Sequence, residues 1–268
     1  MNPALLPQFT ADDWGLSPGV NQGILELARL GIVKRVSCIA NSKFLRHGLE
    51  ELLQVKGIQL GIHFNVTSGQ PLALEEKSGA LSLLLDESRL RQYRSAQQLF
   101  RLAVTTKRAI LYSQMKQALV GQWRFLIGEG LPITYLDGHH HIHLLPGLMN
   151  VLGPTLVEGG ITTVRLPLDP QLAFVKRAVV FWLAVMAKPS VDRLGLRALP
   201  CRYPTLSQLR SNHYVRRLLR NPNTEVIVHP ARESDFSEHG IKDPYAAPRV
   251  EEFSALKGFL QWERETRE

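Results

Sequence analysis

Cysteine is scarce in this chain of 268 residues, which contains only Cys38 and Cys201. Two cysteines are too few for a disulfide framework, and their spacing is not that of a zinc ribbon. The longest apolar run, 178–187, has only half of the roughly 20 residues that a transmembrane helix needs. The chain does not open with a basic stretch followed by an apolar one, so we expect no signal peptide. These absences favour a soluble cytoplasmic protein.

Acidic residues are outnumbered, with 24 Asp and Glu against 32 Lys and Arg and a net charge of +8. Such a balance can favour nucleic acid, anionic lipid or acidic ligands. The basic residues are nevertheless spread over helix-like segments, without interleaved aromatic residues and without a zinc-finger motif. We therefore expect no nucleic-acid partner.

The apolar run 178–187 leaves two interpretations open. Lys176 and Arg177 precede it and Lys188 follows it, which would suit peripheral contact with a membrane surface. The simpler interpretation, which we favour, is a buried helix or a helix that faces a partner, for example in a homodimer.

Short β-branched runs alternate with segments of helical period along the chain. Strands are expected at 32–40, 58–66, 132–136, 162–166 and 224–228, and helices at 20–30, 44–55, 86–127, 148–158 and 250–262. This alternation indicates an α/β fold with a parallel sheet, either a barrel or a doubly wound sheet. We expect a single domain over 1–268. The stretch 168–204, with its four prolines, is interpreted as an insertion that forms a lid or a dimer surface.

Residues suited to catalysis gather where the expected strands end, which is where parallel α/β folds place their sites. The four motifs are Thr10 to Gly15 (TADDWG), Gly61 to Asn65 (GIHFN), Leu136 to His143 (LDGHHHIH) and Val226 to Pro230 (VIVHP). Each has a structural alternative. The paired aspartates could cap a helix, and His63 and His229 could be satisfied core histidines.

The third motif is the hardest to explain structurally, because four closely spaced imidazoles repel one another when protonated and resist burial. A metal ion or catalysis explains them economically. In an extended backbone Asp137, His139, His141 and His143 would share one face. One strand cannot easily supply three ligands to one ion, so we expect the remaining ligands from other strand ends.

Carboxylates combined with imidazoles suit Zn²⁺, Mn²⁺, Co²⁺ or, less well, Mg²⁺. Adjacent side chains in an extended turn point apart, so Asp12 and Asp13 can act separately, one as a metal ligand and the other as a base. A metal-activated water, a carboxylate base and an imidazole acid together make a hydrolase. The residues alone thus predict a metal-dependent hydrolase of unknown substrate.

The four motifs, in this order, resemble those of the YdjC-like carbohydrate deacetylases, which include chitooligosaccharide deacetylase and the hopanoid-biosynthesis deacetylase. The resemblance extends from residue 10 to residue 230. It implies a (β/α) barrel-like fold of the polysaccharide-deacetylase superfamily. It also implies that a metal-activated water removes the acetyl group from an N-acetylated sugar or glycoconjugate.

Site residues follow from the same resemblance. It implies that Asp13, His63 and His139 bind a divalent metal, Mg²⁺ or Zn²⁺, and that Asp12 is the general base. His229 would act as general acid or stabilise the tetrahedral intermediate. The remaining assignments are weaker: Arg165 either contacts substrate oxygens or forms a surface ion pair, and His141 and His143 orient ligands.

Some residues depart from the family pattern. Pro7 interrupts the aliphatic run expected of the first strand, which indicates either a short strand or a strand that starts elsewhere. Trp14 and Ala231 replace the usual Phe and Gly, which affects substrate fit more than chemistry. Two rival hypotheses remain: hydrolysis of another amide or ester on the same scaffold, and a degenerate basic protein that binds polysaccharide or nucleic acid.

Overall fold

The computed structural model describes residues 9–72, 81–86, 88, 92–168, 175–218 and 225–266. The fold is α/β, with seven strands in a closed barrel of order β1-β2-β3-β6-β7-β8-β9. Of the two parallel architectures that the sequence allows, the barrel is therefore the observed one. The chain divides into two compact units, and each is described by itself. The first unit comprises 1–38, 43–59 and 201–268, and the second comprises 39–42 and 60–200. A single domain over 1–268 stays a prediction.

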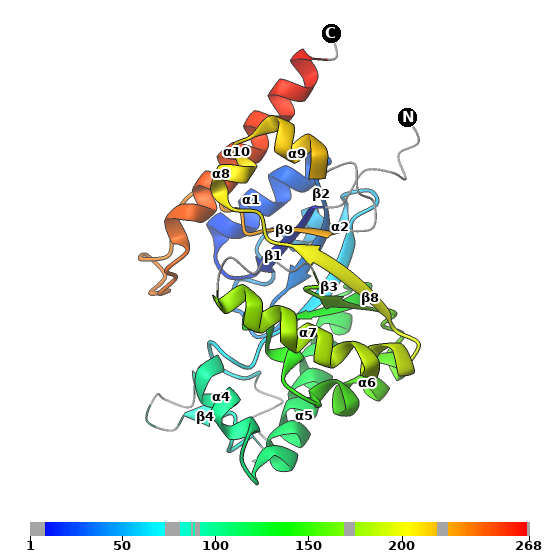
Figure 1. Cartoon of the computed structure of the whole chain (residues 1–268). Helices are drawn as coiled ribbons and strands as arrows, with labels where there is room; N and C mark the ends of the chain where they lie inside the picture. Colours follow the sequence, from blue (N-terminus) through cyan, green and yellow to red (C-terminus); the bar gives the residue numbers. More distant parts are fainter. Residues whose placement is uncertain are drawn as a thin grey trace. The chain divides into compact units, whose positions relative to one another are not determined.

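The first unit is built around strand β1, which pairs in parallel with β2 and with β9 (Figure 1). Its elements are β1 (Phe9–Trp14), α1 (Pro18–Arg29), β2 (Val33–Cys38), α2 (Leu49–Leu53), α8 (Leu206–Leu209), α9 (Asn212–Leu218), β9 (Glu225–Val228) and α10 (Ala246–Glu265). Helix α1 begins at Ser17, whose side chain accepts the Val20 N–H, and Pro18 occupies its first turn. Pro7, from which an irregular first strand is predicted, lies outside the described residues, which begin at Phe9 in β1.

The second unit carries the pairs β3–β6, β6–β7 and β7–β8, all parallel. Its elements are β3 (Gln59–Phe64), β4 (Leu85–Asp86), β5 (Gln92–Tyr93), α4 (Ala96–Ala103), α5 (Arg108–Gly128), β6 (Ile133–Gly138), the 3₁₀ helix η3 (His139–Leu144), α6 (Leu148–Glu158), β7 (Thr163–Leu166), α7 (Val175–Arg193) and β8 (Arg197–Arg202). The first residue of β3 and the last two residues of β8 belong to the first unit.

The long helical segment expected at 86–127 is divided in the structure. Strands β4 and β5 form a small antiparallel sheet, and α4 and α5 follow as two helices. Helix α4 starts at a capping box, in which Ser95 accepts the backbone N–H of Gln98 and Gln98 accepts that of Ser95. Apolar residues recur at helical spacing on both sides of Ser95, so the expected segment shows no break at this helix start.

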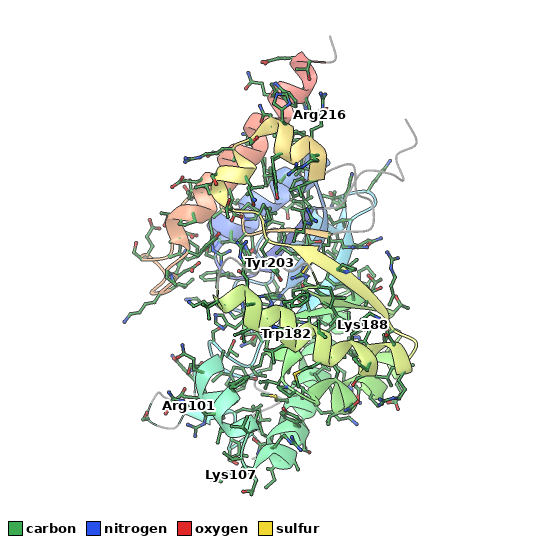
Figure 2. The ribbon with its side chains drawn as sticks, viewed as in Figure 1. Arg101, Lys107, Trp182, Lys188, Tyr203 and Arg216 are labelled. Carbon is green, nitrogen blue, oxygen red and sulfur yellow. The ribbon has the colours of Figure 1, made fainter. Side chains whose placement is uncertain are left out.

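The stretch 168–204 does not interrupt the βα alternation, so its interpretation as an insertion is wrong. It contains helix α7, which contacts α6 and β7, and strand β8, which pairs with β7 from Thr163↔Arg197 to Leu166↔Pro200 (Figure 2 labels Trp182 and Lys188 on α7). The prolines mislead here because α7 continues through Pro189 and β8 includes Pro200. Use as a lid or dimer surface stays a prediction. None of the described helices is long and apolar enough to cross a membrane.

Strands β3 and β6 of the second unit can pack closely because residue 61 is a glycine, which has no side chain. A Cβ atom at this position would lie 2.3 Å from two ring carbons of Tyr135, which is itself buried on β6. Gly61 and Tyr135 are opposite one another in the β3–β6 pair. The glycine therefore makes room for the tyrosine ring and fixes how β3 and β6 pack.

We predict that Gly61→Ala lowers the free energy of unfolding by about 1–3 kcal/mol, because a buried ring must move. Gly258→Ala is the control: this exposed position in α10 has no atom within 4 Å of an added Cβ, so alanine should be neutral or stabilising. Urea unfolding of both variants measures the effect. Equal midpoints for Gly61→Ala and the unchanged protein would contradict this account of the packing.

Candidate active site

The two adjacent aspartates lie at an irregularity in β1. Between Ala11 and Trp14 the strand has one residue more than its partner β2 has between Val36 and Cys38. Asp13 has a φ of 71°, in the left-handed region that non-glycine residues rarely adopt. A bulge of this kind re-aims side chains. It allows Asp12 and Asp13, both buried, to make different contacts although they are neighbours in one strand.

Asp13 is held by an arginine from the far end of the chain. The Arg249 Nη2 atom lies 2.6 Å from Asp13 Oδ2, and its Nε atom lies 2.6 Å from Asp243 Oδ2. Burial by itself lowers the pKa of Arg249, but the charges of Asp13 and Asp243 outweigh burial and raise it. The guanidinium therefore stays charged and keeps one oxygen of Asp13 occupied.

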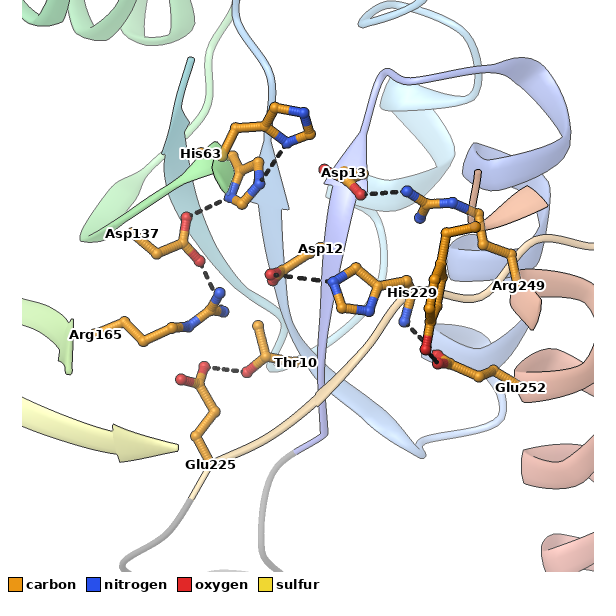
Figure 3. A network of polar contacts seen from close by, with 12 residues as sticks. Thr10, Asp12, Asp13, His63, Asp137, Arg165, Glu225, His229, Arg249 and Glu252 are labelled. Carbon is orange, nitrogen blue, oxygen red and sulfur yellow. Dashed lines mark hydrogen bonds and ion pairs between the residues drawn. The ribbon is translucent and has the colours of Figure 1, made fainter. Parts of the chain in front are cut away.

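Asp12 faces His229, whose Nε2 atom lies 3.9 Å from Asp12 Oδ2 (Figure 3). Helix α10 and its N-cap residue Tyr245 hold this histidine. Glu252 accepts the backbone N–H of His229 at 2.6 Å, and Tyr245 presents its ring to the imidazole with centroids 5.6 Å apart. The Tyr245 hydroxyl in turn donates to Glu252 at 3.0 Å. These contacts place His229 at the carboxyl end of β9 beside a buried carboxylate.

In the second unit a buried carboxylate joins β3 to β7. Asp137 is fully buried; its Oδ1 atom lies 2.7 Å from His63 Nδ1 and its Oδ2 atom 2.7 Å from Arg165 Nη2 (Figure 3). An ionised Asp137 fixes the His63 proton on Nδ1, which leaves the lone pair of Nε2 available as a ligand. Arg165 is 1% exposed, so its interpretation as a surface ion pair is wrong.

His139 completes this arrangement, but not in an extended strand. Strand β6 ends at Gly138, and the histidine-rich segment forms η3, with φ values of 52° at His140 and 57° at His141. The expectation that Asp137, His139, His141 and His143 share one face is therefore wrong, because the backbone turns at the second histidine. His139 Nδ1 lies 3.3 Å from His63 Nε2.

His143 has a structural position in the second unit. It is fully buried, and its Nε2–H donates to the Arg165 carbonyl at 2.9 Å. Burial lowers the pKa of His143 to about 4, although the bond to Arg165 and the charge of Asp137 act in the opposite direction. Its Nδ1 atom lies 2.6 Å from where a Cβ of Gly138 would be, so glycine is required at the end of β6. His143 thus ties η3 to β7 and holds the backbone of Arg165.

Each unit gathers its share of the predicted residues. The first holds Asp12, Asp13 and His229 together, and the second His63, His139 and Arg165. The helix-cap alternative for the aspartates is wrong, since Ser17 caps α1. Sequence reasoning missed the support that comes from Tyr245, at the N-cap of α10, and from Arg249 and Glu252 on the helix itself. These residues are four and three positions apart, a spacing that predicts neighbouring side chains at a helix and could have indicated the cluster.

Comparison with known proteins identifies the family. The profile of the YdjC-like protein family matches residues 8–259, and the chain belongs to this family. A carbohydrate deacetylase of Listeria welshimeri serovar 6b is 26% identical over 250 residues, which cover 92% of this chain and 89% of the relative. The crystal structure of an Enterococcus faecalis V583 protein, provisionally described as a cellobiose-phosphate cleavage protein, has the same fold. It superposes with a TM-score of 0.68 at 18% identity, over 93% of this chain and 89% of that one.

We predict that His143 makes the protein less stable as the pH falls. Between pH 6.5 and about 4 His143 binds a proton in the unfolded chain but stays neutral in the folded chain. The free energy of unfolding therefore decreases by on the order of 3 kcal/mol as the pH falls across this window. Urea unfolding at several pH values in the presence of chelator should show a shallower pH dependence for His143→Gln. The exposed His213→Gln serves as control and should keep the full dependence. Identical profiles for all three proteins would refute the role of burial.

Proposed function

We propose that this protein is a metal-dependent carbohydrate deacetylase, which hydrolyses the acetamide of an N-acetylated sugar or glycoconjugate. The observation that carries the proposal is the pair of facing imidazoles of His63 and His139, with Asp137 behind the first. Membership of the YdjC-like family and the similarity to a carbohydrate deacetylase support the substrate class.

The histidine pair fits a divalent ion. Two imidazole nitrogens bound tetrahedrally to Zn²⁺ at its usual distance are about 3.3–3.4 Å apart, and His63 Nε2 and His139 Nδ1 are 3.3 Å apart. Asp137 supplies the carboxylate that commonly orients a ligating histidine through its other nitrogen. In the absence of an ion the same contact is an N–H···N hydrogen bond, with the proton on His139 Nδ1.

Asp13 is proposed as the third ligand. Its carboxylate is buried and its backbone is held in an unfavourable conformation. Strained backbone at a buried polar residue is typical of functional sites. One carboxylate and two imidazoles leave Zn²⁺ and Mg²⁺ both open, with nitrogen ligands favouring Zn²⁺.

When bound, the ion would supply Lewis-acid polarisation and a water of lowered pKa. Asp12 is proposed to take a proton from the attacking water as general base. His229, beside Asp12, is proposed to give a proton to the departing sugar amine, and Tyr245 and Glu252 keep its ring and backbone in place. Contact of Arg165 with substrate oxygens stays a prediction. Its burial and its bond to Asp137 favour a positioning role for it through His63.

We predict that Asp137→Asn weakens metal binding about 10- to 100-fold, because the amide no longer fixes the His63 tautomer as a carboxylate does. Titration of the metal-free protein with Co²⁺, followed by visible absorption and calorimetry, measures the affinity. Asp192→Asn is the control, since this carboxylate is exposed and pairs only with Lys188 among the described residues. An unchanged Co²⁺ affinity in Asp137→Asn would remove the basis for the ligand assignment.

We predict metal-dependent acetate release from N-acetylated sugars. Metal-stripped protein should be inactive and regain turnover with Zn²⁺, Mn²⁺, Co²⁺ or Mg²⁺. Asp12→Asn should lower kcat about 10²- to 10⁴-fold without loss of metal binding, whereas His139→Ala should lose both.

The assay needs a panel of mono- and oligosaccharides, with acetate measured enzymatically and His213→Ala as control. A kcat of Asp12→Asn equal to that of the unchanged protein would contradict its role as base. Metal-dependent turnover of other amides or esters without acetate from any N-acetylated sugar would instead assign a different hydrolase to the same scaffold.

A further inference from the structure

Helix α7 exposes an apolar stripe. Val175, Val179, Trp182 and Met186 follow one another at intervals of four, three and four residues, so they lie on one face of the helix. Their exposed fractions are large, 83% for Val175, 61% for Trp182 and 59% for Met186. A tryptophan and a methionine in a continuous exposed stripe indicate a contact surface rather than isolated apolar residues.

The opposite face of α7 is already used by the fold. Ala184, Ala187 and Val191 are buried, and α7 contacts α6, β7 and η3 within the second unit. The helix is therefore apolar on two opposite sides, only one of which packs against the described protein. A helix with this pattern is normally covered on both sides.

Positive charge accompanies the stripe. Lys176 and Arg177 stand in the first turn of α7, and Lys188 and Arg193 near its end, against the single acidic residue Asp192. Lys188 pairs with Asp192. The whole chain carries a net charge of +8. At about 100° per residue, Arg193 is in line with the stripe and Lys176 lies beside its start, whereas Arg177 and Lys188 project from the other side of the helix. An apolar stripe with a cation at each end matches a surface that is apolar beneath and anionic above, which is the composition of a bilayer that contains acidic lipids.

We propose that α7 docks on the surface of an anionic lipid bilayer, lying in the plane of the interface. Trp182 and Met186 enter the boundary between headgroups and acyl chains, and Lys176 and Arg193 contact lipid phosphates. With 19 residues α7 is about 28 Å long, and it carries too many charges to span the bilayer. Trp182 is suited to this depth because its indole is apolar over the ring and polar at the N–H.

A second copy of the chain is a poorer occupant of the same stripe. A two-fold pairing of α7 with itself would bring the basic ends of two helices together in a protein that already carries +8. Such like-charge contacts oppose association. The docking does not depend on the proposed deacetylase activity, because α7 carries none of the residues assigned to catalysis.

Vesicle sedimentation tests the proposal. The full chain should sediment with vesicles of phosphatidylcholine and phosphatidylglycerol at 3:1, but hardly with phosphatidylcholine alone, and binding should fall as salt is raised. The double variant Trp182→Ser/Met186→Ser should bind about tenfold more weakly or worse. Val104→Ser/Ile110→Ser, which removes two exposed apolar side chains elsewhere in the second unit, should bind normally.

Circular dichroism and thermal melting establish that both variants are folded, and sedimentation velocity reports the oligomeric state. Tryptophan fluorescence should show a red-edge excitation shift and quenching by brominated lipids. Loss of both effects in Trp182→Phe would add direct evidence for insertion of this side chain. Absence of binding to anionic vesicles, or equal binding of the two double variants, would overturn the proposal. So would a dimer that dissociates only in the α7 variant, which would assign the stripe to a second copy.

Discussion

The polar contacts of the second unit depend on one fully buried carboxylate, that of Asp137. Arg165 and His63 both donate to Asp137 and so stabilise its ionised form at full burial. Removal of one partner from such a buried pair typically costs about 3–5 kcal/mol. The arrangement therefore fixes more than charge. It sets the tautomer of His63, orients the ring on β3, and ties that ring to β7 through the arginine.

The first unit solves a similar problem with other residues. Asp13 depends on Arg249, and the backbone of His229 depends on Glu252, so helix α10 supports both ends of the polar cluster on β1 and β9. Tyr245 adds an aromatic surface beside the imidazole. In each unit a partner outside the motifs takes part: Arg249 and Glu252 hold Asp13 and His229, and Arg165 holds Asp137. Such support is what keeps a catalytic group within reach of its partner while the site is empty.

The sequence predicts the regular part of the fold well, because β-branched runs and helical periods report burial directly. Strand β6 and helix α6 lie where their patterns indicate. It fails where prolines occur inside regular elements, as at Pro189 in α7 and Pro200 in β8. Whether a proline ends an element depends on the packing around it, which local sequence does not contain.

The sequence indicates which residues gather at the candidate site much better than it indicates their geometry. Four motifs at strand ends indicate which side chains take part, but the turn at His140 and the bulge at Asp13 need φ values that no spacing rule predicts. The supporting contacts were hidden for a different reason. Arg249 lies 236 residues from Asp13, so only the folded chain shows that the two belong together.

The bulge in β1 also limits how this strand can change during evolution. Loss of one residue between Ala11 and Trp14 would restore an even ladder with β2 and turn the remaining aspartate toward the opposite side of the sheet. Surface loops elsewhere in the chain can gain or lose residues at little cost. We therefore expect length variation among relatives to fall outside this strand, whose extra residue is a fixed element of its architecture.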